Sequence, residues 1–380
     1  MKIMNKLLFR LLSFVISIEA ASAQAPGPLP EITIPHPPDV VMIDGKPTVY
    51  YEIHLLNVAR DSVELLRLDV FDAVDSSVLV SIPTEELKKI YSPVGVFKGN
   101  KKNILSPGAA SVIYLEYALP NDRPDVPPVH HLTFETSDRH GKKFRSVRIV
   151  PLTFTKKAPL ILGAPLPTGS WIGIYDPTWE RGHRRVLYTV NGKARIPGRF
   201  AVDFIRLDHQ GRYAQGDNDS IKNWYGYDND VLAVADGVVA STLDSFPESP
   251  TLSQHPKYPA EQATGNYISI HIGTDQFVFY EHLKPGSLCV KPGQRVKKGD
   301  VIASVGFTGQ TTGPHLHLHV ANANSPLGAE GIPFAFEQFT LLGSYADFGN
   351  FGKLPWSSPT DAGRTSFVKE RPAPNSVIRF

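Results

Sequence analysis

One stretch of ten residues constrains the fold of this chain more than any other. Residues 311–320 read Thr-Thr-Gly-Pro-His-Leu-His-Leu-His-Val, an alternation with a period of two that predicts a β-strand. His315, His317 and His319 then share one face, where neighbours lie about 6.5–7 Å apart. One imidazole can therefore bind a metal while the next acts on a water or substrate beside it. Because leucine and valine bury the opposite face, we expect the histidines on an exposed face with a chemical role.

The first residues have the pattern of a secretory signal peptide. Lys2, Lys6 and Arg10 accompany an apolar run over residues 11–18, which is too short to span a bilayer. Ala21-Ser22-Ala23 then offers a cleavage site, so residues 1–23 are predicted to be a signal peptide and the mature protein to be periplasmic or extracellular. The alternatives are a cytosolic protein with an apolar first helix, or an uncleaved anchor. No later stretch is long and apolar enough for a transmembrane helix, so no membrane span is expected in the mature chain.

Charge and cysteine content narrow the choice of function. The full chain has a formal net charge of +2, and losing the leader with its three cations and one glutamate leaves about zero. A neutral chain argues against a general affinity for nucleic acid or anionic membranes. Cys289 is the only cysteine, so no internal disulfide can form. Its neighbours predict a small buried hydrophobic residue on a strand.

The remaining sequence predicts an all-β protein of two domains. Residues 26–157 contain several short alternating runs separated by turn signals, which is typical of an immunoglobulin-like β-sandwich. No Cys–Trp–Cys pattern accompanies them, so that likeness concerns architecture alone. After a link rich in proline and glycine, residues 170–342 form a second β domain in which glycine and proline punctuate every strand. Residues 343–380 are predicted to be a polar tail whose apolar pair, Val377-Ile378, docks back.

Five short motifs occur in the order typical of one enzyme family. They are Asp203, residues 235–239 (ADGVV), residues 279–283 (FYEHL), residues 292–300 (PGQRVKKGD) and residues 306–317, which start with GFTG and end at His317. In this series the chain resembles the lysostaphin-like zinc endopeptidases over about residues 180–340. The resemblance implies a small antiparallel β-sheet domain with zinc at an open groove, and bacterial peptidoglycan as the substrate.

The resemblance also implies roles for four residues. Asp203 and His317 fall on positions that bind the metal, whereas His282 and His315 fall on positions that act on the metal-bound water and the developing oxyanion. Physical chemistry agrees, because a metal held by three protein ligands keeps one position for water. A neutral imidazole can accept a proton from that water, and a second can stabilise the tetrahedral oxygen. A period of two also predicts that His282 shares the strand face of Tyr280.

One position departs from the family pattern. The histidine expected four residues before the aspartate is Arg199 here, and a guanidinium does not bind zinc. A histidine from elsewhere can complete the ligand set, with His183 preferred over His209 and His319. Alternatively, an Arg199–Asp203 ion pair replaces the metal.

Three functions from different classes are therefore open. The first is a zinc endopeptidase acting on peptidoglycan or another peptide. The second is an inactive relative that binds cell wall or regulates a hydrolase, which metal analysis separates from the first. The third is a phosphocarrier with two facing histidines, which an export leader disfavours and which phosphoryl transfer to a histidine would reveal.

Overall fold

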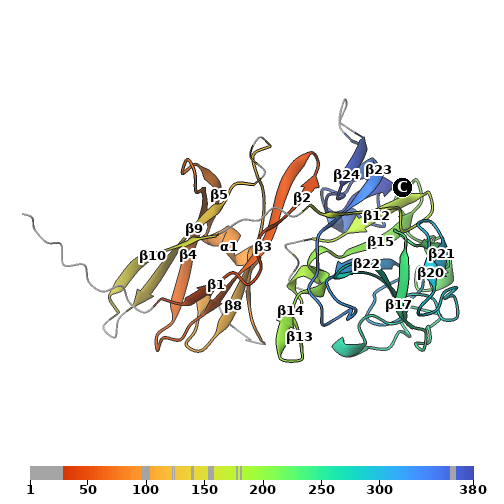
Figure 1. Cartoon of the computed structure of the whole chain (residues 1–380), viewed down its shortest axis with the longest axis horizontal. Coiled ribbons are helices and arrows are strands. Elements are labelled where there is room, and N and C mark those ends of the chain that lie inside the picture. The colour runs from red at the N-terminus through yellow and green to blue at the C-terminus, as the bar shows by residue number, and fades with distance from the viewer. Residues whose placement is uncertain are drawn as a thin grey trace, which may run out of the picture.

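The computed structural model describes residues 29–95, 103–121, 123, 125–137, 141–152, 158–176, 179, 182–359 and 365–380. The predicted signal peptide, residues 1–23, lies outside the described residues. Strands dominate the rest, and they form two bodies that stand side by side (Figure 1). The prediction of a mostly β protein is confirmed. In the part of the chain that is described, no helix is long and apolar enough to cross a membrane.

The N-terminal domain consists of two antiparallel sheets around one core. The first sheet contains β1 (Glu31–Thr33), β2 (Asp39–Ile43), β3 (Lys46–Leu56), β6 (Tyr91–Pro93) and β8 (Ala110–Ala118). The second contains β4 (Val63–Asp72), β5 (Val78–Pro83), β7 (Ile104–Leu105), β9 (Pro128–Ser137) and β10 (Lys143–Pro151). A short helix, α1 (Thr84–Ile90), links β5 to β6.

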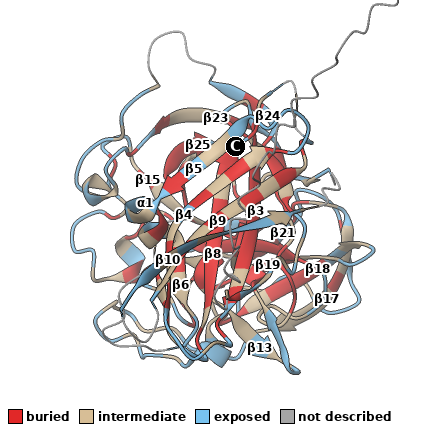
Figure 2. Ribbon diagram, turned by 90° about the vertical axis from the view of Figure 1, so that its left-hand side faces the viewer, coloured by how far each residue is buried: buried red, intermediate tan, exposed pale blue. Residues whose placement is uncertain are grey.

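Alternation, shifted by one residue at an irregularity between Leu65 and Arg67 of β4, explains this sandwich. Along β4 the side chains of Val63, Leu65, Leu68 and Val70 are buried in one core together with residues from β3 and β8. Buried strands run through the middle of the sandwich in Figure 2, whereas β10, at one edge of its sheet, is largely exposed. Two facing antiparallel sheets agree with the predicted sandwich, and the immunoglobulin-like connectivity stays a prediction.

The second domain is built on one long sheet. Its strand order is β11-β23-β25-β12-β15-β22-β19-β18-β17-β20, with β24 paired to β23. The bounds are β11 (Leu160–Leu162), β12 (Ser170–Ile174), β15 (Val202–Leu207), β17 (Gly237–Leu243), β18 (Tyr267–Gly273), β19 (Gln276–Glu281), β20 (Arg295–Val296), β22 (Leu316–Ala321), β23 (Phe334–Ser344), β24 (Ser366–Glu370) and β25 (Ser376–Arg379). The pairs are antiparallel except β11 with β23.

Smaller elements surround this sheet. Two strand pairs stand apart from it: β13 (Tyr188–Val190) with β14 (Lys193–Arg195), and β16 (Asp230–Leu232) with β21 (Val301–Ser304). Short 3-10 helices lie in the connections, namely η1 (His183–Arg185), η2 (Pro197–Phe200), η3 (Ile221–Asn223), η4 (Ala260–Gln262) and η5 (Phe348–Asn350). The first two of these helices lie at the predicted site, because η1 carries His183 and η2 packs against η1 and β22.

Two sequence expectations differ from the structure. Residues 343–380 are not a polar tail, because β25 lies inside the long sheet between β23 and β12. The expected docking of Val377-Ile378 is confirmed, since both residues are fully buried in that strand. Cys289 is exposed and lies in a loop after β19, not buried on a strand. Its neighbours Leu288 and Val290 turn toward the core, so local alternation directs the thiol outward.

Candidate metal centre

Three adjacent strands set the frame of the site. In β22, which lies between β15 and β19, His317 stands opposite Asp203 of β15 on one side and opposite Glu281 of β19 on the other. Directly opposed residues in antiparallel strands have Cβ atoms about 4.5–5.5 Å apart. Leu318 and Val320 of β22 belong to the core on the opposite face, so the strand alternates as the sequence predicts.

His183, in η1, lies beside Asp203 and His317. Its Nε2 atom lies 3.1 Å from Oδ2 of Asp203, and Nδ1 of His317 lies 2.9 Å from Oδ1 of the same carboxylate. One donor atom from each of the three residues lies within 4.8 Å of the others. Ligand atoms of a tetrahedral zinc ion, at about 2.0–2.1 Å from the metal, are about 3.3–3.4 Å apart. The structure therefore brings Asp203, His317 and His183 together with a spacing that suits such an ion.

The remaining ring nitrogen of His317 supports this arrangement. His317 Nε2 lies 3.2 Å from Nδ1 of His319. When Nε2 carries the proton and donates it to His319, Nδ1 keeps its lone pair for a metal. A metal-binding imidazole is commonly oriented by a hydrogen bond of this kind from its other nitrogen.

His315 and His282 stand beside the three donors. His315 Nε2 is 3.4 Å from Asp203 Oδ1, and the His282 ring centroid is 4.6 Å from that of His315 and 5.8 Å from that of His317. Nδ1 of His315 is 2.8 Å from the Gly313 carbonyl oxygen, and Nδ1 of His282 is 2.8 Å from that of Thr308. A carbonyl only accepts, so each Nδ1 carries the hydrogen and donates. Each Nε2 is then left to exchange a proton with a substrate.

The position of His282 corrects the face that alternation predicts. Tyr280 packs in the core on the face opposite the histidines, so an unbroken strand would turn His282 away from His315. Instead β19 ends at Glu281, and His282 has a φ of 63°. This left-handed conformation is uncommon for a residue with a side chain and is often found at functional sites. The backbone change places the imidazole against His315 and His317.

The face that carries the histidines is also not exposed, contrary to expectation. The side chains of His315 and His317 are 8% and 9% exposed, and that of His319 is 2% exposed. The helix η2 packs over β22, and His319 stacks on Phe279 with ring centroids 4.7 Å apart. Asp203 and His183 keep more contact with solvent, at 19% and 29%. The open side of the cluster therefore lies at these two residues.

Electrostatics separates the two histidines that flank the donors. Burial lowers the pKa of His282 well below its usual range, and the neighbouring His315 and His317 lower it further. For His315, burial lowers the pKa, but the Asp203 carboxylate outweighs it and the net shift is upward. Burial alone would raise the pKa of Asp203, whereas His183 and His315 hold it well below its usual range. A neutral imidazole and a more basic one next to each other suit a division of roles between acceptor and donor of a proton.

Glu281 is a site residue that the sequence analysis did not select. Its carboxylate is buried on the His317 face, with Oε1 3.6 Å from Nδ1 of His319, and burial followed by the charge of Asp203 raises its pKa well above the usual range. Alternation along β19 was the signal that could have found it. Glu281, His317 and His319 also form a second group with metal-ligand spacing. That group is buried throughout, whereas catalysis needs an open coordination position, so the group with His183 and Asp203 is the better candidate.

Arg199 and His209 take no part in the cluster. The Arg199 guanidinium pairs with Glu52 at 2.9 Å and with Glu330 at 2.5 Å, so the alternative of an Arg199–Asp203 pair does not apply. Arg199 pairs with these two buried carboxylates outside the site instead of with Asp203. Both are far from Arg199 in the sequence, so no local pattern predicts the pairing. His209 is exposed in the turn after β15.

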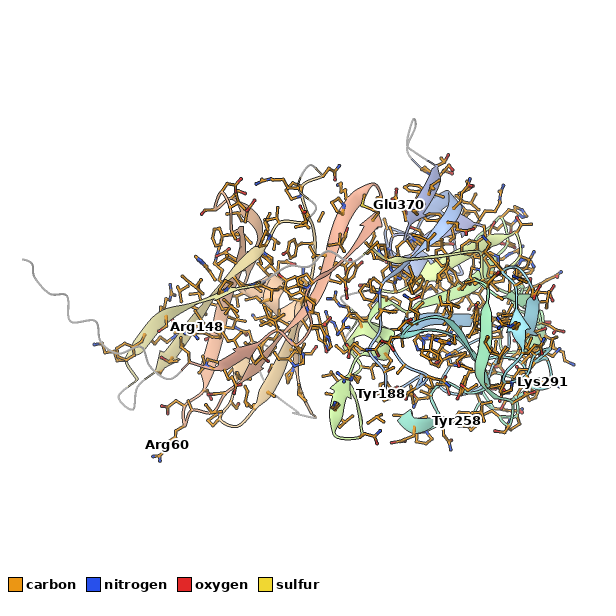
Figure 3. The ribbon with its side chains drawn as sticks, in the orientation of Figure 1. Arg60, Arg148, Tyr188, Tyr258, Lys291 and Glu370 are labelled. Carbon is orange, nitrogen blue, oxygen red and sulfur yellow. The ribbon has the colours of Figure 1, made fainter. Side chains whose placement is uncertain are left out.

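Two further segments lie near residues of the site. Tyr188, at the start of the β13–β14 hairpin, and Tyr258, in the loop 246–262, both lie at the lower edge of the molecule in Figure 3. Burial, then the charges of Glu281 and Glu261, raise the pKa of Tyr188, so the hairpin lies near the buried glutamate. The loop is attached by His255, whose Nε2 is 2.7 Å from the Gly309 carbonyl oxygen.

Comparison with known proteins identifies part of the second domain. Residues 220–328 match Peptidase family M23, so the chain contains a peptidase M23 domain. This segment includes His282, His315 and His317, and it begins after His183 and Asp203. The predicted resemblance to this class of metallopeptidase is confirmed at the level of the domain.

Curated relatives match a short segment of the chain. Peptidoglycan DD-endopeptidase ShyB of Vibrio cholerae is 45% identical over 65 residues, which is 17% of this chain and 15% of the relative. ShyA of the same organism, also a peptidoglycan DD-endopeptidase, is 40% identical over 73 residues, or 19% and 16%. The chain thus matches less than a fifth of the length of each.

Solved structures with some likeness to the chain include two catalytic domains. The catalytic domain of lysostaphin from Staphylococcus simulans is 21% identical, with a TM-score of 0.24 over 44% of this chain and 88% of that domain. The catalytic domain of the M23 protein EnpA from Enterococcus faecalis is 16% identical, with a TM-score of 0.26 over 46% and 94%.

Proposed function

We propose that this protein is an exported zinc endopeptidase that hydrolyses peptide cross-links of peptidoglycan. The observation that carries the proposal is the meeting of three metal-donor side chains, His183, Asp203 and His317, with two further histidines whose Nδ1 atoms are held by backbone carbonyls and whose Nε2 atoms face the cluster. The peptidase M23 domain and the peptidoglycan endopeptidases among its relatives support both the reaction and the substrate. The leader at residues 1–23 supports a location in the periplasm or outside the cell, where peptidoglycan lies.

His183 is the proposed third ligand in place of the histidine that Arg199 replaces. A zinc ion held by His183, Asp203 and His317 supplies Lewis acidity, which acidifies water and polarises a peptide carbonyl. Two imidazoles and one carboxylate are a common donor set for catalytic zinc, and the partial exposure of Asp203 and His183 leaves room for a substrate. The ion pairs of Arg199 with Glu52 and Glu330 leave Asp203 available for a metal.

His282 and His315 are the proposed catalytic residues. His282, with its lowered pKa, is neutral at pH 7 and can accept the proton of the attacking water at Nε2. His315, with its raised pKa, can donate a hydrogen bond or a proton from Nε2 to the oxygen that becomes negative. Backbone carbonyls fix both rings at Nδ1, so little reorientation is needed during the reaction.

Digestion of purified peptidoglycan tests this function. Peptidoglycan treated with the zinc-loaded protein is then digested with a muramidase, and the muropeptides are separated by liquid chromatography and identified by mass spectrometry. We expect treatment to raise the share of uncrosslinked muropeptides, and a chelator to prevent this increase. As a matched control, His209→Ala removes an exposed histidine outside the cluster and should leave digestion unchanged. Zinc binding without any release of products would favour the inactive wall-binding alternative, and a protein that does not bind zinc at all would contradict the proposed metal centre.

A further inference from the structure

Glu52 of the N-terminal domain connects two arginines of the second domain. It lies on β3 and is 1% exposed. Its Oε1 accepts a hydrogen bond from Nε of Arg184 at 3.1 Å, and its Oε2 accepts one from Nε of Arg199 at 2.9 Å. Both arginines are themselves buried, at 5% exposure. One carboxylate therefore joins two separate segments of the neighbouring domain.

Each of these segments leads directly to a proposed metal ligand. Arg184 follows His183 in η1, and Arg199 lies in η2, which runs into β15 and Asp203. The two helices also touch each other, because a Cβ atom on Gly198 would lie 2.9 Å from the His183 carbonyl oxygen. The position of η1 relative to β15 thus depends on what holds the two arginines.

The N-terminal domain provides most of the contacts of Arg184. Besides Glu52, its guanidinium donates to the carbonyl oxygens of Tyr51 at 3.0 Å and Leu115 at 2.6 Å, on β3 and β8. It also lies over the ring of Tyr50, 4.9 Å from the centroid. A single 3-10 turn of three residues has little stability of its own, so these contacts determine where it lies.

We propose that Glu52 is a positioning residue for the metal centre, by which the N-terminal domain holds His183 at the distance from Asp203 that zinc requires. The inference rests on the proposed metal ligands and adds a role for the N-terminal domain. Glu52 is ionised at neutral pH: burial raises its pKa, but Arg199 and Arg184 outweigh burial and lower it. A neutral glutamine at this position keeps the shape of the side chain and removes the charge that holds both guanidinium groups.

The test compares zinc affinity in full-length variants. Zinc dissociation constants are measured by competition with a chromophoric chelator, and absorption of the Co²⁺-substituted protein reports the ligand set. We expect Glu52→Gln to bind zinc about 10–100-fold more weakly, the usual effect of losing a residue that orients a ligand. Its Co²⁺ spectrum should shift toward that of His183→Ala, which lacks the ligand outright.

Leu68→Ala is the matched control for stability. Leu68 is fully buried in the core of the N-terminal sandwich, on β4 of the other sheet, so its truncation lowers the melting temperature without touching the arginines. We expect its zinc affinity and Co²⁺ spectrum to equal those of the wild type. Equal losses of affinity in Leu68→Ala and Glu52→Gln would overturn the proposal, because a general loss of stability would then explain both.

A second variant covers the case in which Glu52→Gln does not fold. Arg184→Lys keeps the positive charge but loses the planar group that contacts Tyr51 and Leu115, and it should weaken zinc binding about tenfold. Wild-type zinc affinity in the folded Glu52 variant, or failing that in the Arg184 variant, would overturn the positioning role alone. A wild-type protein that binds no zinc would instead contradict the proposed function.

Discussion

The substitution Gly198→Ala gives a direct test of how closely the site depends on packing between η1 and η2. A Cβ atom at Gly198 would lie 2.9 Å from the carbonyl oxygen and 3.0 Å from the Cβ of His183. Ordinary contact begins near 3.4 Å, so η1 must move by about 0.5 Å, and overpacking of this kind costs about 1–3 kcal/mol. Metal–ligand distances vary by only about 0.2 Å, so His183 would no longer meet the metal together with Asp203 and His317.

Zinc competition with a chelator, together with a thermal melt, measures the effect. We expect Gly198→Ala to lose about 10–100-fold in zinc affinity while remaining folded. Gly226→Ala is the control, because its Cβ atom would meet its nearest neighbours at 3.4 Å and therefore fits without displacement. A folded Gly198→Ala protein with wild-type zinc affinity would refute the reasoning, since His183 would then have moved without consequence.

Three further predictions follow from individual residues. Asp203→Ala should release the metal, whereas His315→Ala should abolish peptidoglycan cleavage and keep the metal. Elemental analysis and a digestion assay on both variants check this. Retained zinc in the Asp203 variant would contradict the assignment of Asp203 as a ligand. Burial lowers the pKa of His130 to about 4, below its usual 6.5, so the unfolded chain takes up a proton at this residue more readily than the folded chain does. The free energy of unfolding should therefore be highest above pH 6.5 and fall by about 3 kcal/mol as the pH drops toward 4. Urea unfolding of the N-terminal domain should show a weaker pH dependence in His130→Gln, and an unchanged one would count against this source. Tyr280→Phe should lower stability by about 1–3 kcal/mol, because the backbone N–H of Val234 donates to the buried Tyr280 hydroxyl at 2.8 Å; unchanged chemical denaturation would contradict that cost.

The sequence predicts the strands of the site well, because alternation is a local property. Residues 316–321 form β22, with Leu316 and Leu318 in the core and His317 on the other face. The pairing of this strand with β15 then brings Asp203 opposite His317. Local alternation places His317 on the histidine face, whereas Asp203 was selected through the family resemblance, and the structure places the two residues together.

The features that the sequence did not predict depend on contacts between distant segments or on single backbone angles. Glu52 and Arg199 are 147 residues apart, and no local pattern relates them. His282 turns to the site through one left-handed residue, which period-two alternation cannot anticipate. The last strand, β25, pairs with β12, about 200 residues earlier in the chain. Its apolar run is too short to predict a sheet strand by itself, so the sequence assigned it to a tail.

Anomalous X-ray diffraction at the zinc absorption edge, on crystals of the zinc-loaded full-length protein, tests the central claim most directly. We predict one anomalous peak within about 2.0–2.2 Å of His183 Nε2, a carboxylate oxygen of Asp203 and His317 Nδ1. A peak among Glu281, His317 and His319 instead, or no peak near Asp203, would contradict the proposed metal centre.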